Sequence, residues 1–171
     1  MSNASIKTIQ SIFASRLDTL THLLNKAEEA FDRDPTFLQK RLAPDMAPFG
    51  TQIAFTCNQP RNFARWLQGK PADNLDPSVE TLERARSYIA ETKQLLLDLP
   101  ADDTKLTENV QLDLGPSLYA DLPGSVYVHD FLLPNFYFHL VTAYDILRNA
   151  GVTIGKADYM LHLVPLVKSR A

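Results

Sequence analysis

The sequence has very little cysteine, and this limits the chemistry open to it. Its 171 residues include one cysteine, Cys57, so neither an intramolecular disulfide nor a cysteine-cluster metal site can form. A lone thiol fits a reduced, cytoplasmic setting. The N-terminal segment MSNASIKTIQSIF lacks the regions of a signal peptide, and no stretch is apolar for the ~20 residues of a membrane span. We therefore expect a cytoplasmic protein that does not enter a membrane.

Excess positive charge and the common catalytic motifs are also missing. The formal net charge is −3, which gives no basic footprint and predicts no nucleic-acid partner. The chain has no GxSxG elbow, no glycine-rich phosphate loop and no histidine pair with HExxH spacing. Cys57 lies on or beside the apolar face of a predicted helix, where a hydrophobic role is favoured over nucleophilic catalysis. The residues alone therefore name no substrate.

What the chain does have is apolar residues at spacings of three and four, the signature of amphipathic helices. The pattern predicts four long helices, over residues 5–31, 45–69, 76–99 and 134–151. Four such helices joined by modest loops are typical of an all-α fold, a four-helix bundle. The length favours a single domain over residues 1–171.

Residues that begin and end helices support these boundaries. Ser5 and Asp76 are predicted N-caps, and Gly69 and Gly151 are predicted C-terminal caps. Pro60 falls inside the second helix, where it predicts a kink or a break into two shorter helices.

The connection before the last helix is different. VQLDLG at 110–115 alternates apolar and polar residues, and the following GPSLYADLPG is rich in turn residues. This predicts a short strand or one arm of a hairpin, followed by a loop, so the connection is long and partly β-like. Ser125 is then predicted to cap a short helical segment that leads into Pro134.

The last helix carries a histidine on its apolar side. At about 100° per residue, His139 falls among apolar positions of the run LLPNFYFHLVTAYDILRNAGV, with Asn135 one turn earlier on nearly the same line. Buried polar groups need partners. The second helix offers Gln52 and Thr56 at the edge of its apolar face. We therefore predict a polar cluster between the two helices, formed by Gln52, Thr56, Asn135 and His139. Tyr137 and Tyr144 could add their hydroxyl groups to this cluster.

Two interpretations of His139 remain open. It is either a core histidine satisfied by hydrogen bonds, or a metal ligand or acid–base group near neutral pH. His22 falls on the polar side of the first helix and is predicted to be solvated. His129 could reach the mouth of the bundle. Phe138 points to the polar side of its helix, where it could mark a dimer surface or meet another segment of the chain.

Two segments, LAPDMAPFGTQIAF at 42–55 and LPNFYFHLVTAYDILRNAGVTIGKADY at 133–159, resemble a family of bacterial proteins of unknown function in the DinB-like (DinB/YfiT) superfamily. The match is closest in the runs PNFYFH and TAYDILR. The resemblance implies an up-down-down-up four-helix bundle and frequent homodimers. It also implies descent from proteins that hold a divalent metal, often zinc or nickel, with one histidine from the second helix and two, spaced HxxxH, from the last.

Carried over to this chain, His139 matches the last of these metal ligands. Asn135 stands where the preceding histidine would be, and the second helix has no histidine, only Gln52, Phe55 and Thr56 nearby. Amide oxygens are poor zinc or nickel ligands beside imidazole. The resemblance therefore implies at most a weak divalent-metal site at His139.

Two functional hypotheses follow from this site. The first is a dimeric binding or structural protein whose former metal site has become a polar pocket, formed by Gln52, Thr56, Asn135, His139 and Tyr144. The second is a metal-dependent enzyme of thiol transferase or hydrolase type, in which His139 acts as ligand or base. The small-molecule ligand or substrate is not indicated in either case.

Overall fold

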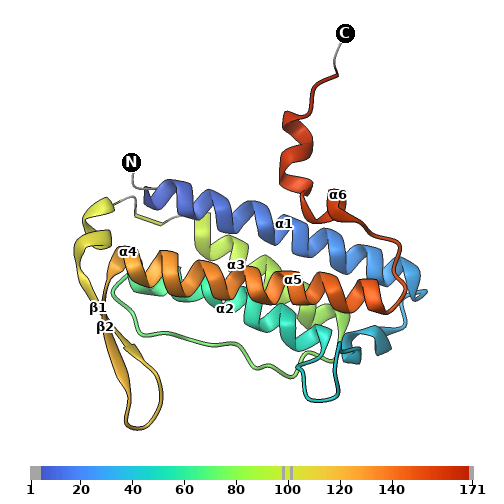
Figure 1. Cartoon of the computed structure of the whole chain (residues 1–171), viewed down its shortest axis with the longest axis horizontal. Coiled ribbons are helices and arrows are strands. Elements are labelled where there is room, and N and C mark those ends of the chain that lie inside the picture. The colour runs from blue at the N-terminus through green and yellow to red at the C-terminus, as the bar shows by residue number, and fades with distance from the viewer. Residues whose placement is uncertain (1–4, 98, 101, 170–171) are drawn as a thin grey trace.

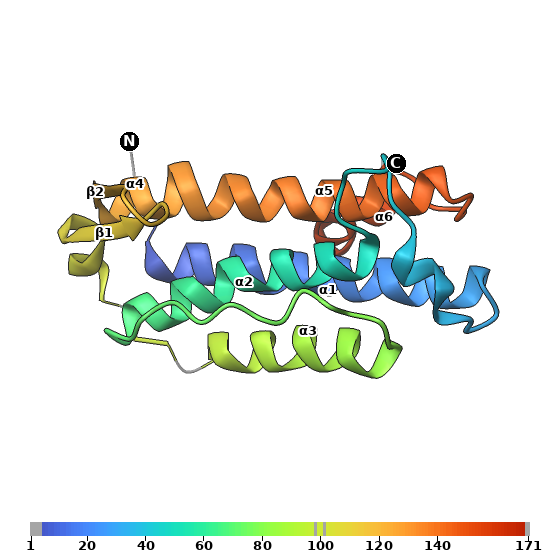
Figure 2. The ribbon, with the colours of Figure 1, turned by 90° about the horizontal axis from the view of Figure 1, so that it is seen from below.

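Four long helices pack side by side in the computed structural model, which describes residues 5–97, 99–100 and 102–169 (Figures 1 and 2). They are α1 (Ile6–Ala30), α2 (Phe49–Leu67), α3 (Leu82–Leu97) and α5 (Leu133–Asn149). Phenylalanines from three of them meet in the core. The ring of Phe13 lies 5.4 Å from that of Phe63 and 5.0 Å from that of Phe136. The predicted all-α four-helix bundle is confirmed.

The bundle has two pairs of helices that run in opposite directions (Figures 1 and 2). Helices α1 and α5 run one way, and α2 and α3 run the other. Because α2 and α3 are consecutive and parallel, the chain has to return along the bundle between them. Residues 70–81 make this return as an extended segment, here called the strap.

The strap is held by polar side chains along one side of α2. Asn58 accepts a hydrogen bond from the Leu75 backbone N–H at 2.8 Å, and Asn62 accepts one from the Asp73 N–H at 3.2 Å. Two further side chains donate to strap carbonyls, Thr51 to Pro77 and Arg65 to Pro71, each at 2.9 Å. An extended segment makes few hydrogen bonds within its own backbone, and side chains of α2 supply partners for the strap instead.

The start of the third helix was predicted wrongly. Asp76 does not cap it, because the helix does not start until Leu82, and the Asp76 carboxylate accepts a hydrogen bond from the Ser78 N–H within the strap. Helix α3 begins at Leu82, where Thr81 accepts from the Arg84 N–H at 3.2 Å. The strap stays extended because Val79 is buried against α2 at Gly50, where an added Cβ would lie 2.2 Å from the Val79 carbonyl oxygen.

The other helix ends agree with the prediction more closely. Ser5 caps α1 and accepts a hydrogen bond from the Thr8 N–H. Helix α2 begins at Phe49, later than predicted, and continues unbroken through Pro60. Gly69 and Gly151 adopt φ values of +67° and +88°, the left-handed conformation of C-terminal caps.

A β-hairpin precedes the last helix. Strand β1 (Asn109–Asp113) pairs antiparallel with β2 (Tyr119–Pro123), so the segment predicted as a loop forms a second strand. The chain then enters α4 (Gly124–Val126) and a π-helical turn (Tyr127–Leu132) that continue directly into α5. The last helical run is therefore longer than predicted, and Ser125 lies inside it rather than at its cap.

The chain ends in a segment that leaves the bundle. Short helix α6 (Lys156–Tyr159) lies beside α1, and a 3₁₀ helix (Leu161–Leu166) projects away from the four helices (Figure 1). Shorter 3₁₀ helices follow α1 at Pro35–Gln39 and precede β1 at Asp103–Thr107. No helix in the described part of the chain is long and apolar enough to cross a membrane.

Candidate functional site

The candidate site lies between α2 and α5. His139, in the middle of α5, and Gln52, in the first turn of α2, are joined by a hydrogen bond of 2.9 Å between Nδ1 and Oε1. Gln52 is buried, with 3% of its surface exposed. The two residues are far apart in the chain, and the antiparallel packing of α2 on α5 brings them together.

A second hydrogen bond determines which nitrogen of His139 carries the proton. The Gln52 Nε2 group donates to the Ala47 carbonyl at 3.1 Å, so Oε1 is the atom that faces the imidazole. An amide oxygen can only accept, and Nδ1–H must therefore be the donor. In the neutral ring this leaves the lone pair on Nε2, the nitrogen available to a ligand, a proton or a metal.

The surroundings of His139 favour its neutral form. Burial lowers the pKa of His139 below its ordinary value of 6.5, because desolvation penalises the imidazolium. The ring lies between two aromatic neighbours, with centroid distances of 5.1 Å to Phe55 and 5.2 Å to Phe138. Phe138 itself is 60% exposed, so the imidazole lies near the surface end of a layer of aromatic rings.

Thr56 and Asn135, also predicted at the site, each donate to the carbonyl four residues earlier in the chain. Thr56 donates to the Gln52 carbonyl at 2.7 Å, and the Asn135 amide donates to the Phe131 carbonyl at 2.7 Å. Within residues 5–97, 99–100 and 102–169, neither is hydrogen-bonded to His139. The structure thus brings together the pair Gln52–His139 from the predicted cluster of four.

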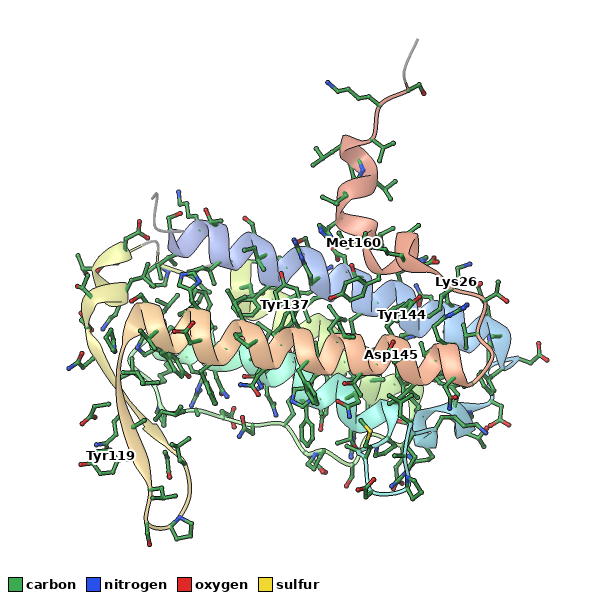
Figure 3. The ribbon with its side chains drawn as sticks, viewed as in Figure 1. Lys26, Tyr119, Tyr137, Tyr144, Asp145 and Met160 are labelled. Carbon is green, nitrogen blue, oxygen red and sulfur yellow. The ribbon has the colours of Figure 1, made fainter. Side chains whose placement is uncertain are left out.

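Tyr144 lies on a different side of α5 from His139. Its ring packs against Tyr159 of α6, with centroids 5.9 Å apart. Figure 3 shows Tyr137 and Tyr144 together along the edge of α5 that faces α1 and the C-terminal segment. Neither tyrosine therefore adds a hydroxyl to the Gln52–His139 pair.

The side chains around His139 do not fit a zinc or nickel site with three protein ligands. Among the described residues, no group of three or more histidine, cysteine, aspartate or glutamate side chains is close enough to hold a metal ion. The neighbours of the imidazole are the Gln52 amide and phenyl rings. An amide oxygen is a weak ligand for these metals, and Gln52 uses its oxygen to bind Nδ1–H.

Cys57 and His22 have surroundings that decide their chemistry. Cys57 is fully buried in α2, and burial raises the pKa of its thiol to about 12, so the reactive thiolate is not populated near neutral pH. His22 was predicted to be solvated, but its Nε2 lies 2.7 Å from a carboxylate oxygen of Asp158 in α6. No local pattern around His22 indicates this pair, because Asp158 lies in the irregular C-terminal segment.

A four-helix bundle in which a histidine of α5 faces α2 places the chain in the class of DinB-like helical proteins. The family model "Domain of unknown function (DUF1993)" matches residues 5–160, and the chain belongs to this family. A crystal structure of a DinB family member protein from Shewanella denitrificans is similar to it at 30% sequence identity, with a TM-score of 0.75 over 88% of each chain. No curated protein matches the chain.

Proposed function

We propose that this protein is a cytoplasmic, homodimeric binding or structural protein, a single DinB-like domain over residues 1–171 in which a hydrogen-bonded pair replaces a metal site. The Gln52–His139 bond carries the proposal. Its donor and acceptor are both fixed, since Gln52 is itself oriented by the Ala47 carbonyl. A site built in this way stabilises a neutral imidazole without any ion.

The pair would also suit a small ligand better than a cation. Nε2 offers a single acceptor, and the rings of Phe55 and Phe138 beside it offer apolar faces. A small ligand with one hydrogen-bond donor and a flat apolar part matches both features. The net charge of −3 supports the absence of a nucleic-acid partner.

One observation favours a second candidate, a metal-dependent enzyme of thiol transferase or hydrolase type. The Nε2 atom of His139 makes no hydrogen bond with the described residues, and a metal-bound histidine typically has its other nitrogen engaged by an oxygen acceptor, as Nδ1 is here. In that case His139 would act as ligand or base, and Asn135 and Gln52 would orient substrate or water.

Metal analysis of the purified protein separates the two candidates. We expect less than stoichiometric zinc and nickel by elemental mass spectrometry, and His139→Gln is expected to lower the melting temperature without changing the metal content. His129→Gln alters an exposed histidine and serves as the matched control. One metal ion per chain that is lost in His139→Gln and kept in His129→Gln would overturn the proposal in favour of the enzyme.

A further inference from the structure

The C-terminal arm, residues 161–167, exposes apolar side chains that nothing in the described chain covers. The exposed fractions are 42% for Leu163, 53% for Val164, 72% for Leu166 and 74% for Val167. The arm projects from the bundle and begins just after residue 160, where the match to the family model ends (Figures 1 and 3). Contiguous exposed apolar side chains of this kind mark an interaction surface.

The base of the arm is fixed on α1. The His22–Asp158 pair ties α6 to this helix at 2.7 Å, and Asp158 also accepts a hydrogen bond from the Gly155 N–H at 2.7 Å. Nδ1 of His162, the second residue of the arm, is buried, and this burial together with the nearby Arg16 of α1 lowers the pKa of His162. Figure 3 shows Met160 at the foot of the arm, next to α1. The arm is therefore held away from the bundle by its base.

A groove with an apolar floor and polar edges lies between α1 and α3. It has a volume of about 820 Å³, and its apolar lining includes Leu24, Ile89, Leu96 and Leu97. Its cationic lining consists of Lys7 together with Arg86 and Lys93, which are paired with Glu28 and Asp18. Leu97 is 66% exposed although it ends a helix whose other apolar residues are largely covered. The groove is large enough for several side chains of an extended segment.

The arm of the same chain cannot reach this groove without leaving its base. At about 100° per residue, Gln10, Ala14 and Thr21 of the groove lie on one side of α1, whereas Arg16, the α1 side chain whose charge acts on His162 of the arm, lies on another. The helix itself thus separates the arm from its own groove. A second copy of the chain has no such obstacle.

The order of chemical groups along the groove matches the order along the arm. Beyond this groove, the same side of α1 continues into a hollow of about 530 Å³ lined by Glu28, Glu29 and Asp32 together with Arg33. Glu28 is paired with Arg86, while Glu29 is largely exposed, with only a surface pair to Lys26. Directly after the arm, the apolar run is followed in sequence by Lys168. An apolar segment that ends in positive charge thus fits a groove that ends in carboxylates.

We propose that two copies of this protein exchange their C-terminal arms, each arm filling the α1–α3 groove of the other copy. This gives a closed, twofold-symmetric dimer in which the same contact is made twice. The inference rests on the homodimer in the proposed function and adds the surfaces that form it. The exchanged arm covers the exposed leucines and valines, and it covers Leu97 of the receiving copy.

Sedimentation equilibrium of the full-length protein tests the exchange. We expect the wild-type chain to be a dimer and the double variant Leu166→Glu/Val167→Glu to dissociate with a Kd raised roughly 100-fold or more, since two apolar anchors are lost. The matched control, Leu114→Glu/Leu118→Glu, places the same change on the exposed hairpin turn and should remain dimeric. Circular dichroism verifies that all of the variants are folded.

A groove variant completes the test. Leu97→Glu should also be monomeric alone, but a mixture with the arm variant should form heterodimers, because one intact arm then meets one intact groove. A monomeric wild type, or a Leu97→Glu variant that dimerises like the wild type, overturns the exchange. A wild-type dimer that survives the arm substitutions overturns the exchange but leaves a homodimer in place. The Gln52–His139 proposal is tested separately by metal content.

Discussion

Two histidines of this bundle are hydrogen-bonded to partners that differ in charge. His139 donates to the neutral amide of Gln52 between α2 and α5, whereas His22 meets the carboxylate of Asp158 between α1 and α6. The distances are similar, 2.9 and 2.7 Å, but the pKa effects differ. Burial lowers the pKa of His139, and the hydrogen bond from His22 lowers the pKa of the Asp158 carboxyl.

The difference shows how the location of a histidine selects its partner. Between α2 and α5, where Gln52 is buried, a charged side chain in its place would add the cost of burying a charge, and an amide satisfies Nδ1–H without that cost. At the surface, water screens the charges, so a carboxylate is tolerated but contributes little. We therefore expect the inner pair to matter for folding and the outer pair to matter for the position of the C-terminal segment.

The largest expected effect comes from removing the partner of the inner histidine. Gln52→Leu leaves the Nδ1–H of His139 without an acceptor in a desolvated place, which should lower the free energy of unfolding by roughly 1–3 kcal/mol. Urea unfolding measures this change. Gln68→Leu, at an exposed position beyond α2, is the control and should stay within about 0.5 kcal/mol of the wild type. Equal losses in both variants would show that the inner pair contributes nothing.

Removing both partners should cost less than removing one. The double variant Gln52→Leu/His139→Leu has no unpaired donor, so its free energy of unfolding should recover part of what Gln52→Leu loses. A double-mutant cycle measured by urea unfolding gives the coupling between the two side chains. Additive losses would contradict a direct interaction.

The pH dependence of stability should separate the two histidines. The folded pKa of His139 lies below its ordinary value of 6.5, so the unfolded chain binds the proton more strongly. The contribution of neutral His139 to the free energy of unfolding is therefore present above about pH 6.5, and it is lost as the pH falls towards the folded pKa. His139→Gln should reduce this loss of stability between pH 6.5 and the folded pKa, while Gln68→Leu, which alters no titratable group, should leave it unchanged. For Asp158, whose pKa is lowered from 3.8, the corresponding loss occurs only below that pH.

The smallest effect on global stability is expected at the outer pair. His22→Ala removes a partly exposed pair and should lower the free energy of unfolding by less than about 1 kcal/mol. Its local effect should be larger. Hydrogen exchange of the amides of α6 should accelerate relative to those of α3. Unchanged exchange in α6 would mean that Asp158 holds this segment through Gly155 alone.

Features that depend on local pattern could be predicted from the sequence. The caps at Ser5, Gly69 and Gly151 follow from side-chain and backbone chemistry within one turn. The inward direction of His139, and its proximity to Gln52, follow from helical periodicity together with the packing of two apolar faces.

Features that depend on distant partners could not be predicted. Asp76 and Pro77 form a good helix start, but this segment stays extended, with the Pro77 carbonyl bound by Thr51 of α2 and Asp76 bound to the Ser78 N–H. Thr56 and Asn135 were predicted to join His139, but each donates its hydrogen bond to the backbone carbonyl four residues earlier in the chain. Periodicity gives the direction of a side chain but does not choose among the acceptors within its reach.

The strap also sets a limit on how this chain can change in length. Asn58 and Asn62 bind backbone groups two residues apart, at Leu75 and Asp73, so an inserted residue would move one of them out of reach. Within the part of the chain that the structure describes, the turn of the hairpin at 114–118 makes hydrogen bonds only inside the hairpin. The hairpin turn should therefore tolerate insertions, fused peptides and circular permutation, whereas the strap should not. The length of the strap is set by the spacing of its partners on α2.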